Sequence, residues 1–453
     1  MKQNDRPTNE SQRSRSIPTV SAVLPSGALV EMIYDPTALR SGFVVWENGA
    51  WRVEPSIVLD DGRRLVPYSP HNNLLQNEVV LLPSTPEEYD SEEQLIAEVQ
   101  AFIHRYADLS PIFEKIASYY VLLSWIYDRF SELPYLRFRG DPGTGKTRSL
   151  LIIGSLCYKP IFASGASTVS PLFRILDAVR GTLIIDEGDF RLSDERAELV
   201  KILNNGNARG FPVLRSEVTP QREFNPRAYA VFGPKLVATR GAFDDPALES
   251  RFLTEEMGQG GLREDIPISL PSAYKDEALH LRNQLLLFRF RNRGRASALP
   301  DLIDRTVEPR LNQIFLPLLS VAANESVKTE LRELARQYNR EIIAERGMDA
   351  EAHILEIIRD MVASDDRATL SVKEITSWFV DRHGEEYERK ITPKWIGGLI
   401  RRRLQLFTHK SNGVYVISHL EEPRLRRLYQ KYGVEAKRPG NAASADSGGG
   451  VAS

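Results

Sequence analysis

The chain has 453 residues, of which 42% are hydrophobic and 26% are charged, and its formal net charge is −2. This length predicts more than one domain, and the near-neutral charge gives no overall signal for a nucleic-acid partner. The single cysteine, Cys157, excludes an intramolecular disulfide, and the seven scattered histidines show no zinc-binding pattern. Without a bilayer-length apolar run or a secretory signal pattern, we expect a cytoplasmic protein that has no membrane association.

The first part of the chain predicts a polar tail followed by strands. Residues 1–16 are charged and poor in apolar groups, so we expect them to be disordered. Residues 17–83 predict a small β-rich domain, in which Asn48-Gly49 is a hairpin turn between aromatic-rich arms. Trp46 and Trp51 flank this turn and form either a cross-strand packing pair or a base-stacking platform, of which packing is favoured.

Residues 84–132 predict a helical linker of two helices. Glu92–Tyr106 carries apolar side chains at helical spacing, and Pro111–Phe130 is strongly apolar. The second helix is therefore expected to pack on the domain that follows.

A phosphate-binding loop is the strongest motif of the chain. The eight residues that match G-x-x-x-x-G-K-[ST] are Gly140, Asp141, Pro142, Gly143, Thr144, Gly145, Lys146 and Thr147. A strand is predicted before them and a helix after them, so the loop amides and the helix N-terminus would face an anion. Lys146 would reach the β- and γ-phosphates of ATP, and the Thr147 hydroxyl would bind Mg²⁺.

Two carboxylates follow a second buried strand. Leu183-Ile184-Ile185 is a continuous apolar run, typical of a parallel strand, and Asp186-Glu187 comes directly after it. Asp186 would accept hydrogen bonds from Mg²⁺-bound water, and Glu187 would polarise the attacking water. The alternative is a solvated acidic pair at a strand end.

The spacing of these motifs resembles that of the AAA+ ATPases. Forty positions separate Lys146 from Asp186, which is room for one helix, one strand and one helix. The resemblance implies an α/β fold with a P-loop parallel sheet, an AAA+ core over 133–254 and a helical lid over 255–345.

The same resemblance implies further residues of an ATPase site. Thr239 ends the predicted strand Lys235–Thr239, at the position of the residue called sensor 1. Arg251 corresponds to the arginine finger, which acts on the nucleotide of a neighbouring subunit in a homo-oligomer, and Arg240 is the alternative finger. Arg310 opens a helix that resembles the sensor 2 helix, and it is a candidate contact to the γ-phosphate.

The segment between Glu187 and Thr239 predicts a β-hairpin with a charged tip. A hairpin here resembles that of helicase-like ATPases of phages, plasmids and integrated elements, in the superfamily III and minichromosome-maintenance groups. The resemblance implies a hexameric ring on single-stranded or forked DNA. The hairpin arginines expected to face that DNA are Arg215, Arg222 and Arg227. The alternative is a β-excursion on the surface.

Residues 350–432 predict a winged helix-turn-helix. From Arg389 to Arg438 there are thirteen Lys and Arg residues against three Asp and Glu residues, a local positive charge suited to a polyanion. The predicted recognition helix and wing carry Lys394, Arg401, Arg402, Arg403 and Lys410. A protein-interaction winged helix is the alternative, and residues 438–453 predict a disordered tail.

These expectations give one leading hypothesis and two rivals. The leading hypothesis is an oligomeric AAA+ ATPase that uses ATP and Mg²⁺ to act on DNA as a helicase for the replication of a mobile element. One rival is a remodeller of partner proteins. The other is a DNA-binding regulator or loader for which ATP is only a conformational signal.

Overall fold

The computed structural model consists of two compact units, Met1–Ala335 and Arg336–Ser453, and each is described by itself. None of the helices in the described ranges combines the length and the apolar character that a membrane-spanning segment needs. The predicted tails and the residues Glu187 and Arg222 lie outside these ranges. The structure describes residues 16–165, 167–186, 194–216, 225–243, 245–258, 263–347, 349–364, 369–384, 391–411, 413–418 and 421–434.

Two small sheets form the N-terminal part of the first unit, with the orders β2-β3-β4-β5 and β1-β7-β6. The predicted Asn48-Gly49 turn is confirmed, because both residues have positive φ (52° and 83°) and Trp46 pairs with Trp51 across the hairpin. Trp46 also stacks on Phe290, so its ring is used in packing. The strands are β1 (Ser16–Pro18), β2 (Ser21–Val23), β3 (Leu29–Asp35), β4 (Arg40–Glu47), β5 (Ala50–Glu54), β6 (Ile57–Val58) and β7 (Arg64–Val66).

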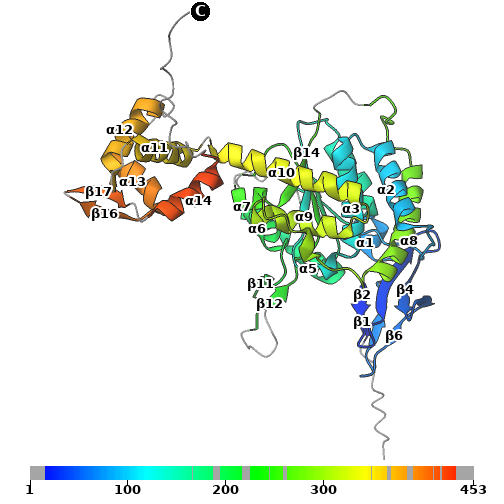
Figure 1. Cartoon of the computed structure of the whole chain (residues 1–453). Coiled ribbons are helices and arrows are strands. Elements are labelled where there is room, and N and C mark those ends of the chain that lie inside the picture. Colours follow the sequence, from blue (N-terminus) through cyan, green and yellow to red (C-terminus); the bar gives the residue numbers. More distant parts are fainter. Residues whose placement is uncertain are drawn as a thin grey trace, which may run out of the picture. The chain divides into compact units, whose positions relative to one another are not determined.

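Helices α2 (Glu92–Tyr106) and α3 (Pro111–Trp125) follow the short α1 (Asn73–Gln76) and pack against each other (Figure 1). The Ser91 hydroxyl caps α2 by accepting the N–H of Gln94 at 3.1 Å. Nearly every residue of α3 is buried, which explains why its sequence is apolar on all sides.

The centre of the first unit is a five-stranded parallel sheet with the order β14-β8-β13-β10-β9. Both faces of the sheet are covered, so its strands are mostly buried, and all of β13 is buried, including Lys235. The loops after β8, β13 and β10 therefore meet at one edge, which we call the carboxyl edge. The strands and the helices between them are β8 (Tyr135–Arg139), α4 (Lys146–Leu156), β9 (Ile161–Ser164), α5 (Val169–Val179), β10 (Leu183–Asp186), α6 (Asp194–Asn205), β13 (Lys235–Thr239), α7 (Pro246–Glu249) and β14 (Phe252–Glu256).

Helices α8 (Ala273–Asn292), α9 (Pro309–Val321) and α10 (Glu325–Gly347) follow β14. Helix α8 packs against α2, α3 and α4, and α9 packs against α3 (Figure 1). Polar residues of α8 are buried in this packing; Asn283, for example, accepts the N–H of Ser84 at 2.9 Å. The segment predicted as a lid is thus attached to the sheet domain by its first two helices.

In the ranges that the structure describes, the second unit has four helices after α10 and one antiparallel sheet with the order β15-β17-β16. Ile354, Ile358, Phe379, Ile396 and Ile400 form its core. The Thr392 hydroxyl caps α13 by accepting the N–H of Trp395 at 3.3 Å. The elements are α11 (Ala350–Ser364), β15 (Thr369–Ser371), α12 (Val372–His383), α13 (Pro393–Arg402), β16 (Thr408–Ser411), β17 (Val414–Ser418) and α14 (Glu422–Tyr432).

Candidate functional site

The loop between β8 and α4 has a backbone that glycine alone suits. Gly143 and Gly145 have φ of 85° and 91°, in the left-handed region. A side chain on Gly140 would place its Cβ 2.7 Å from the carbonyl oxygen of Met257. Met257 follows β14, and its N–H donates to the carbonyl oxygen of Arg139 at 2.7 Å, so the chain after β14 packs directly against the loop.

Positive charge collects where this loop meets α4. The ammonium of Lys146, the first residue of α4, donates to the carbonyl oxygens of Gly140 and Asp141, each at 2.6 Å. The first turn of α4 has no acidic residue that would compensate the helix dipole. An anion bound here would therefore meet a cation and a helix N-terminus together.

Thr147 and Asp186, which are far apart in the sequence, meet at the carboxyl edge. The Thr147 hydroxyl donates to Asp186 Oδ2 at 2.8 Å. Thr147 lies on α4, which follows β8, and Asp186 ends β10. Strand β13 lies between β8 and β10, so the contact of the two residues depends on the order of the sheet. A hydroxyl and a carboxylate oxygen are ligands that suit Mg²⁺, and the donor set therefore fits the predicted metal.

Thr239 ends β13, between the phosphate loop and Asp186. Its carbonyl oxygen accepts the N–H of Gly140 at 3.2 Å, and the residue is 2% exposed. Within the described part of the chain, its Oγ1 has no hydrogen-bond partner. A buried hydroxyl without a partner is unfavourable, which marks Thr239 as a group able to bind a polar ligand or water in this site.

Arg251 is bound within its own chain. Its Nε donates to Asn207 Oδ1 at 2.9 Å, its Nη2 donates to the Asn204 carbonyl oxygen at 3.3 Å, and its Nη1 contacts the Ala247 carbonyl oxygen. Burial, together with the charge of Arg310, lowers the pKa of Arg251. The two predicted nucleotide-binding arginines thus lie beside each other.

This arginine pair lies at the amino edge of the sheet, opposite the phosphate loop. The Arg251 carbonyl oxygen accepts the N–H of Tyr135, the first residue of β8, whereas Gly140 follows the last. The length of β8 separates these two positions by about 13 Å. The alternative finger, Arg240, is exposed and directly follows Thr239, at the carboxyl edge.

The predicted hairpin consists of β11 (Val213–Arg215) and β12 (Arg227–Tyr229), which pair antiparallel. Arg215 forms an ion pair with Glu198 at 2.8 Å and lies over the Phe173 ring. Arg227 pairs with Asp177 at 3.6 Å and keeps 56% of its side chain exposed. Both arginines therefore contact residues of α5 or α6 in this structure.

The predicted basic residues of the second unit lie on α13 and the β16–β17 hairpin. Lys394, Arg401, Arg402 and Lys410 are exposed. Arg403 is also exposed but pairs with an acidic side chain of α11 at 3.7 Å.

Two exposed aromatic residues beside these basic residues were not predicted from the sequence: Phe407 (65% exposed) and Tyr415 (51%). The Arg401 guanidinium lies over the Tyr415 ring, 5.3 Å from its centroid. The interleaving of aromatic and basic residues was the signal that could have found them.

No protein-family model and no curated protein matches the sequence. Among solved structures, the chain is similar to an active helicase, SCCmec type IV Cch, at 11% identity and a TM-score of 0.39 over 90% of this chain and 99% of that one. It is also similar to the NrS-1 C-terminal region (12%, TM-score 0.36, 86% and 96%) and to a full-length MCM homolog from Methanopyrus kandleri (11%, TM-score 0.34, 69% and 78%). At these identities and TM-scores, the assignment of a function depends on the chain's own residues and geometry.

Proposed function

We propose that this protein hydrolyses ATP as an AAA+ motor and acts on DNA, as a helicase of a mobile genetic element. The observation that carries the ATPase proposal is the contact between Thr147 and Asp186, 2.8 Å apart and next to a glycine loop that ends in a lysine. A chance glycine-rich turn would not bring the carboxylate of Asp186, at the end of β10, into contact with the hydroxyl of Thr147.

The substrate is ATP with Mg²⁺, and the bound metal would offset the charge of the phosphate oxygens. Lys146 and the N-terminus of α4 bind and orient the phosphates, while the Thr147 hydroxyl would bind the ion and Asp186 would accept hydrogen bonds from its bound water. Glu187 accepts a proton from the attacking water, and the Thr239 hydroxyl positions that water. The buried, unpartnered Oγ1 of Thr239 supports its role.

The opposite locations of the phosphate loop and the arginine pair support an oligomer. Arg251 and Arg310 are at the amino edge, so neither reaches the nucleotide bound to its own chain. In a ring, the same edge faces the phosphate loop of a neighbour, where Arg251 stabilises the charge that develops on the γ-phosphate. Arg310 lies beside it and would act on the same neighbouring nucleotide. We propose a homo-oligomeric ring of six subunits.

The proposed partner is DNA because the second unit has the element order of a winged helix-turn-helix. Helices α11, α12 and α13 pack against one another, and α12 packs against the antiparallel β15-β17-β16 sheet. Lys394, Arg401 and Arg402 are exposed on α13, and Lys410 is exposed on the hairpin that would be the wing. This arrangement suits a helix in the major groove and a wing on the phosphate backbone.

A second candidate function is a remodeller or loader without unwinding activity. The ion pairs of Arg215 with Glu198 and of Arg227 with Asp177 favour it, because paired arginines have less charge to offer DNA. ATP turnover would then respond to a protein partner, or DNA would bind without being unwound.

The test is the steady-state ATPase rate with and without single-stranded DNA, together with unwinding of a forked duplex. We expect DNA to stimulate turnover. Arg215→Ala should remove that stimulation and keep the basal rate, whereas Lys201→Ala, on the exposed face of α6, should keep both. Glu187→Gln should bind ATP and not turn it over. A DNA-independent rate without unwinding would reject the helicase proposal, and normal turnover in Glu187→Gln would remove that residue as the base.

A further inference from the structure

A cavity of about 700 Å³ lies in the first unit, away from the nucleotide site. Its lining includes Tyr158, Arg180 and Phe232, which come shortly before β9, β10 and β13. It is therefore at the amino edge of the sheet. Residues 18–23 of the N-terminal β-structure also line it, so the cavity lies between two parts of the same unit. Its volume is in the range of small-ligand sites.

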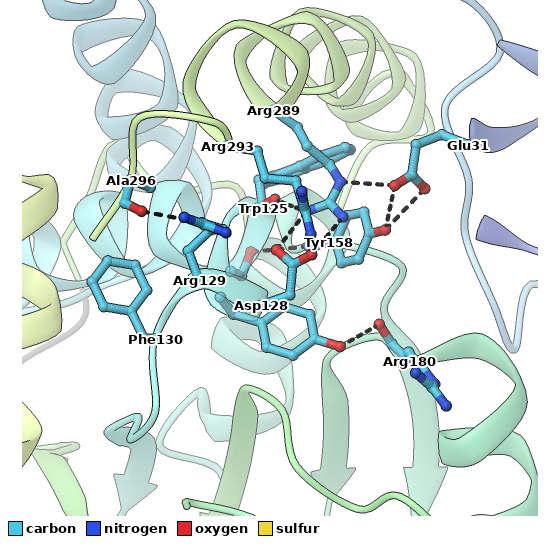
Figure 2. A network of polar contacts seen from close by, with 12 residues as sticks. Glu31, Trp125, Asp128, Arg129, Phe130, Tyr158, Arg180, Arg289, Arg293 and Ala296 are labelled. Atoms are coloured by element: carbon cyan, nitrogen blue, oxygen red, sulfur yellow. Dashed lines mark hydrogen bonds and ion pairs between the residues drawn. The ribbon is translucent and has the colours of Figure 1, made fainter. Parts of the chain in front are cut away.

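An ionic network lines the inner end of this cavity. Figure 2 shows Arg289 between Glu31 and Asp128, with Arg293 directed at the same Asp128 carboxylate. The Tyr158 hydroxyl donates to Glu31 at 2.7 Å. Burial opposes ionisation of Asp128, but the two arginines lower its pKa to about 2. Both carboxylates are thus ionised and already occupied by cations.

Cations remain in excess after these pairs are formed. Lys159, which is not part of the lining, shares Glu31 with Arg289, and burial together with the Arg289 charge lowers the pKa of Lys159 to about 8. Arg209 also lines the cavity; it is exposed and donates to the backbone carbonyl oxygens of Phe130 and Asp128. A carbonyl satisfies a hydrogen bond without neutralising the charge. The full lining has four arginines (Arg180, Arg209, Arg289 and Arg293) against three carboxylates (Glu31, Asp128 and Asp177), so guanidinium groups are in excess, which favours an anion.

Aromatic rings accompany these guanidinium groups. Phe211 lines the cavity and is 66% exposed, an unusual position for a phenylalanine. The Arg209 guanidinium lies 4.7 Å from the centroid of the Phe232 ring, and Phe232 packs on Tyr127. Guanidinium groups for phosphate and exposed rings for bases are the combination by which proteins bind single-stranded nucleic acid.

We propose that this cavity binds a phosphate-bearing segment of single-stranded DNA, with Arg293 and Arg209 at phosphate and Phe211 against a base. The inference rests on the proposed function, and it names a second contact with DNA, separate from the hairpin and the winged helix. The chain also connects this cavity to the arginine pair, because Arg209 follows Asn207, which holds Arg251 at 2.9 Å. DNA in the cavity would therefore influence the residue that acts on the neighbour's ATP.

The test uses full-length variants and a short fluorescein-labelled oligothymidylate, with binding followed by anisotropy over a range of salt concentrations. Arg293→Gln removes one cavity cation, and its matched control is Arg295→Gln, an exposed arginine of the same segment. We expect Arg293→Gln to weaken binding about tenfold and to reduce the salt slope by about one, with no change in the control. Phe211→Ala should weaken binding about tenfold with an unchanged slope. Because Phe211 is exposed, that variant tests the cavity even if Arg293→Gln does not fold.

Three results would overturn the inference. If wild type binds the oligonucleotide and neither variant is weakened, the cavity is not a DNA site, although the proposed function stands. If thymidine monophosphate binds with a dependence on Arg293 and Phe211 that the oligonucleotide lacks, the cavity takes a free nucleotide. If wild type binds no DNA, the DNA part of the proposed function fails together with this inference.

Discussion

Thr239→Val separates a catalytic role of the buried hydroxyl from a structural one. Valine has the shape of threonine and suits a strand, so the change removes only the hydroxyl of Thr239 from a site that is 2% exposed. Burying a hydroxyl without a partner costs about 1–3 kcal/mol. We therefore expect the free energy of unfolding of the apoprotein to stay level or rise by about 1 kcal/mol. Turnover should fall on the order of 100-fold, because an oriented hydrogen-bonding group in the transition state is lost.

Thr182→Val is the matched control, just before the neighbouring strand β10. Thr182 is fully buried, and its hydroxyl donates to the Tyr158 carbonyl oxygen at 3.0 Å. Removal of this bond should lower the free energy of unfolding by about 1 kcal/mol and leave ATP turnover unchanged. Urea unfolding followed by tryptophan fluorescence measures stability, and a coupled assay measures phosphate release.

Two results would refute this reasoning. A loss of stability in Thr239→Val as large as that in Thr182→Val would mean that the Thr239 hydroxyl is paired within the fold. A stable Thr239→Val variant with wild-type turnover would mean that the hydroxyl has no part in hydrolysis.

Three further predictions address the fold, the loop and the ring. Glu31→Gln leaves buried cations without their carboxylate and should lower the free energy of unfolding by about 3–5 kcal/mol in urea titrations; a loss below 1 kcal/mol would contradict the network. Gly140→Ala puts a Cβ 2.7 Å from the Met257 carbonyl oxygen, and it should abolish binding of a fluorescent ATP analogue. A normal affinity for the analogue would show that the loop can shift to accommodate the side chain. Mixing Arg251→Ala with Lys146→Ala subunits should restore part of the ATPase rate that each lacks alone, and no recovery would count against a finger acting in trans.

Local pattern predicted several elements of the first unit. Helix α2 has the predicted bounds Glu92–Tyr106, since its apolar spacing and its capping serine are properties of neighbouring residues. The strand Lys235–Thr239 was likewise predicted, and its apolar centre, Leu236–Ala238, is a property of neighbouring residues. The ionic network escaped prediction because Arg289 and Glu31 are 258 positions apart, and no local spacing relates them.

The partners of individual arginines also depended on tertiary structure. Sequence position favoured Arg251 as an arginine finger and Arg215 as a DNA contact. It could not show that Arg251 donates to Asn207 or that Arg215 forms an ion pair with Glu198. Their side chains are long, so the elements packed nearby determine which acceptor they reach.

The sequence by itself determined the phosphate loop, because a glycine at each strained position and a lysine at the helix start are local requirements of one anion-binding turn. The tertiary structure alone decided what that loop meets. The order of the parallel strands brings Asp186 to Thr147 and leaves Thr239 between them, while Arg251 is placed at the opposite edge. Strand order arises from packing of the whole chain, which is why no single segment encodes it.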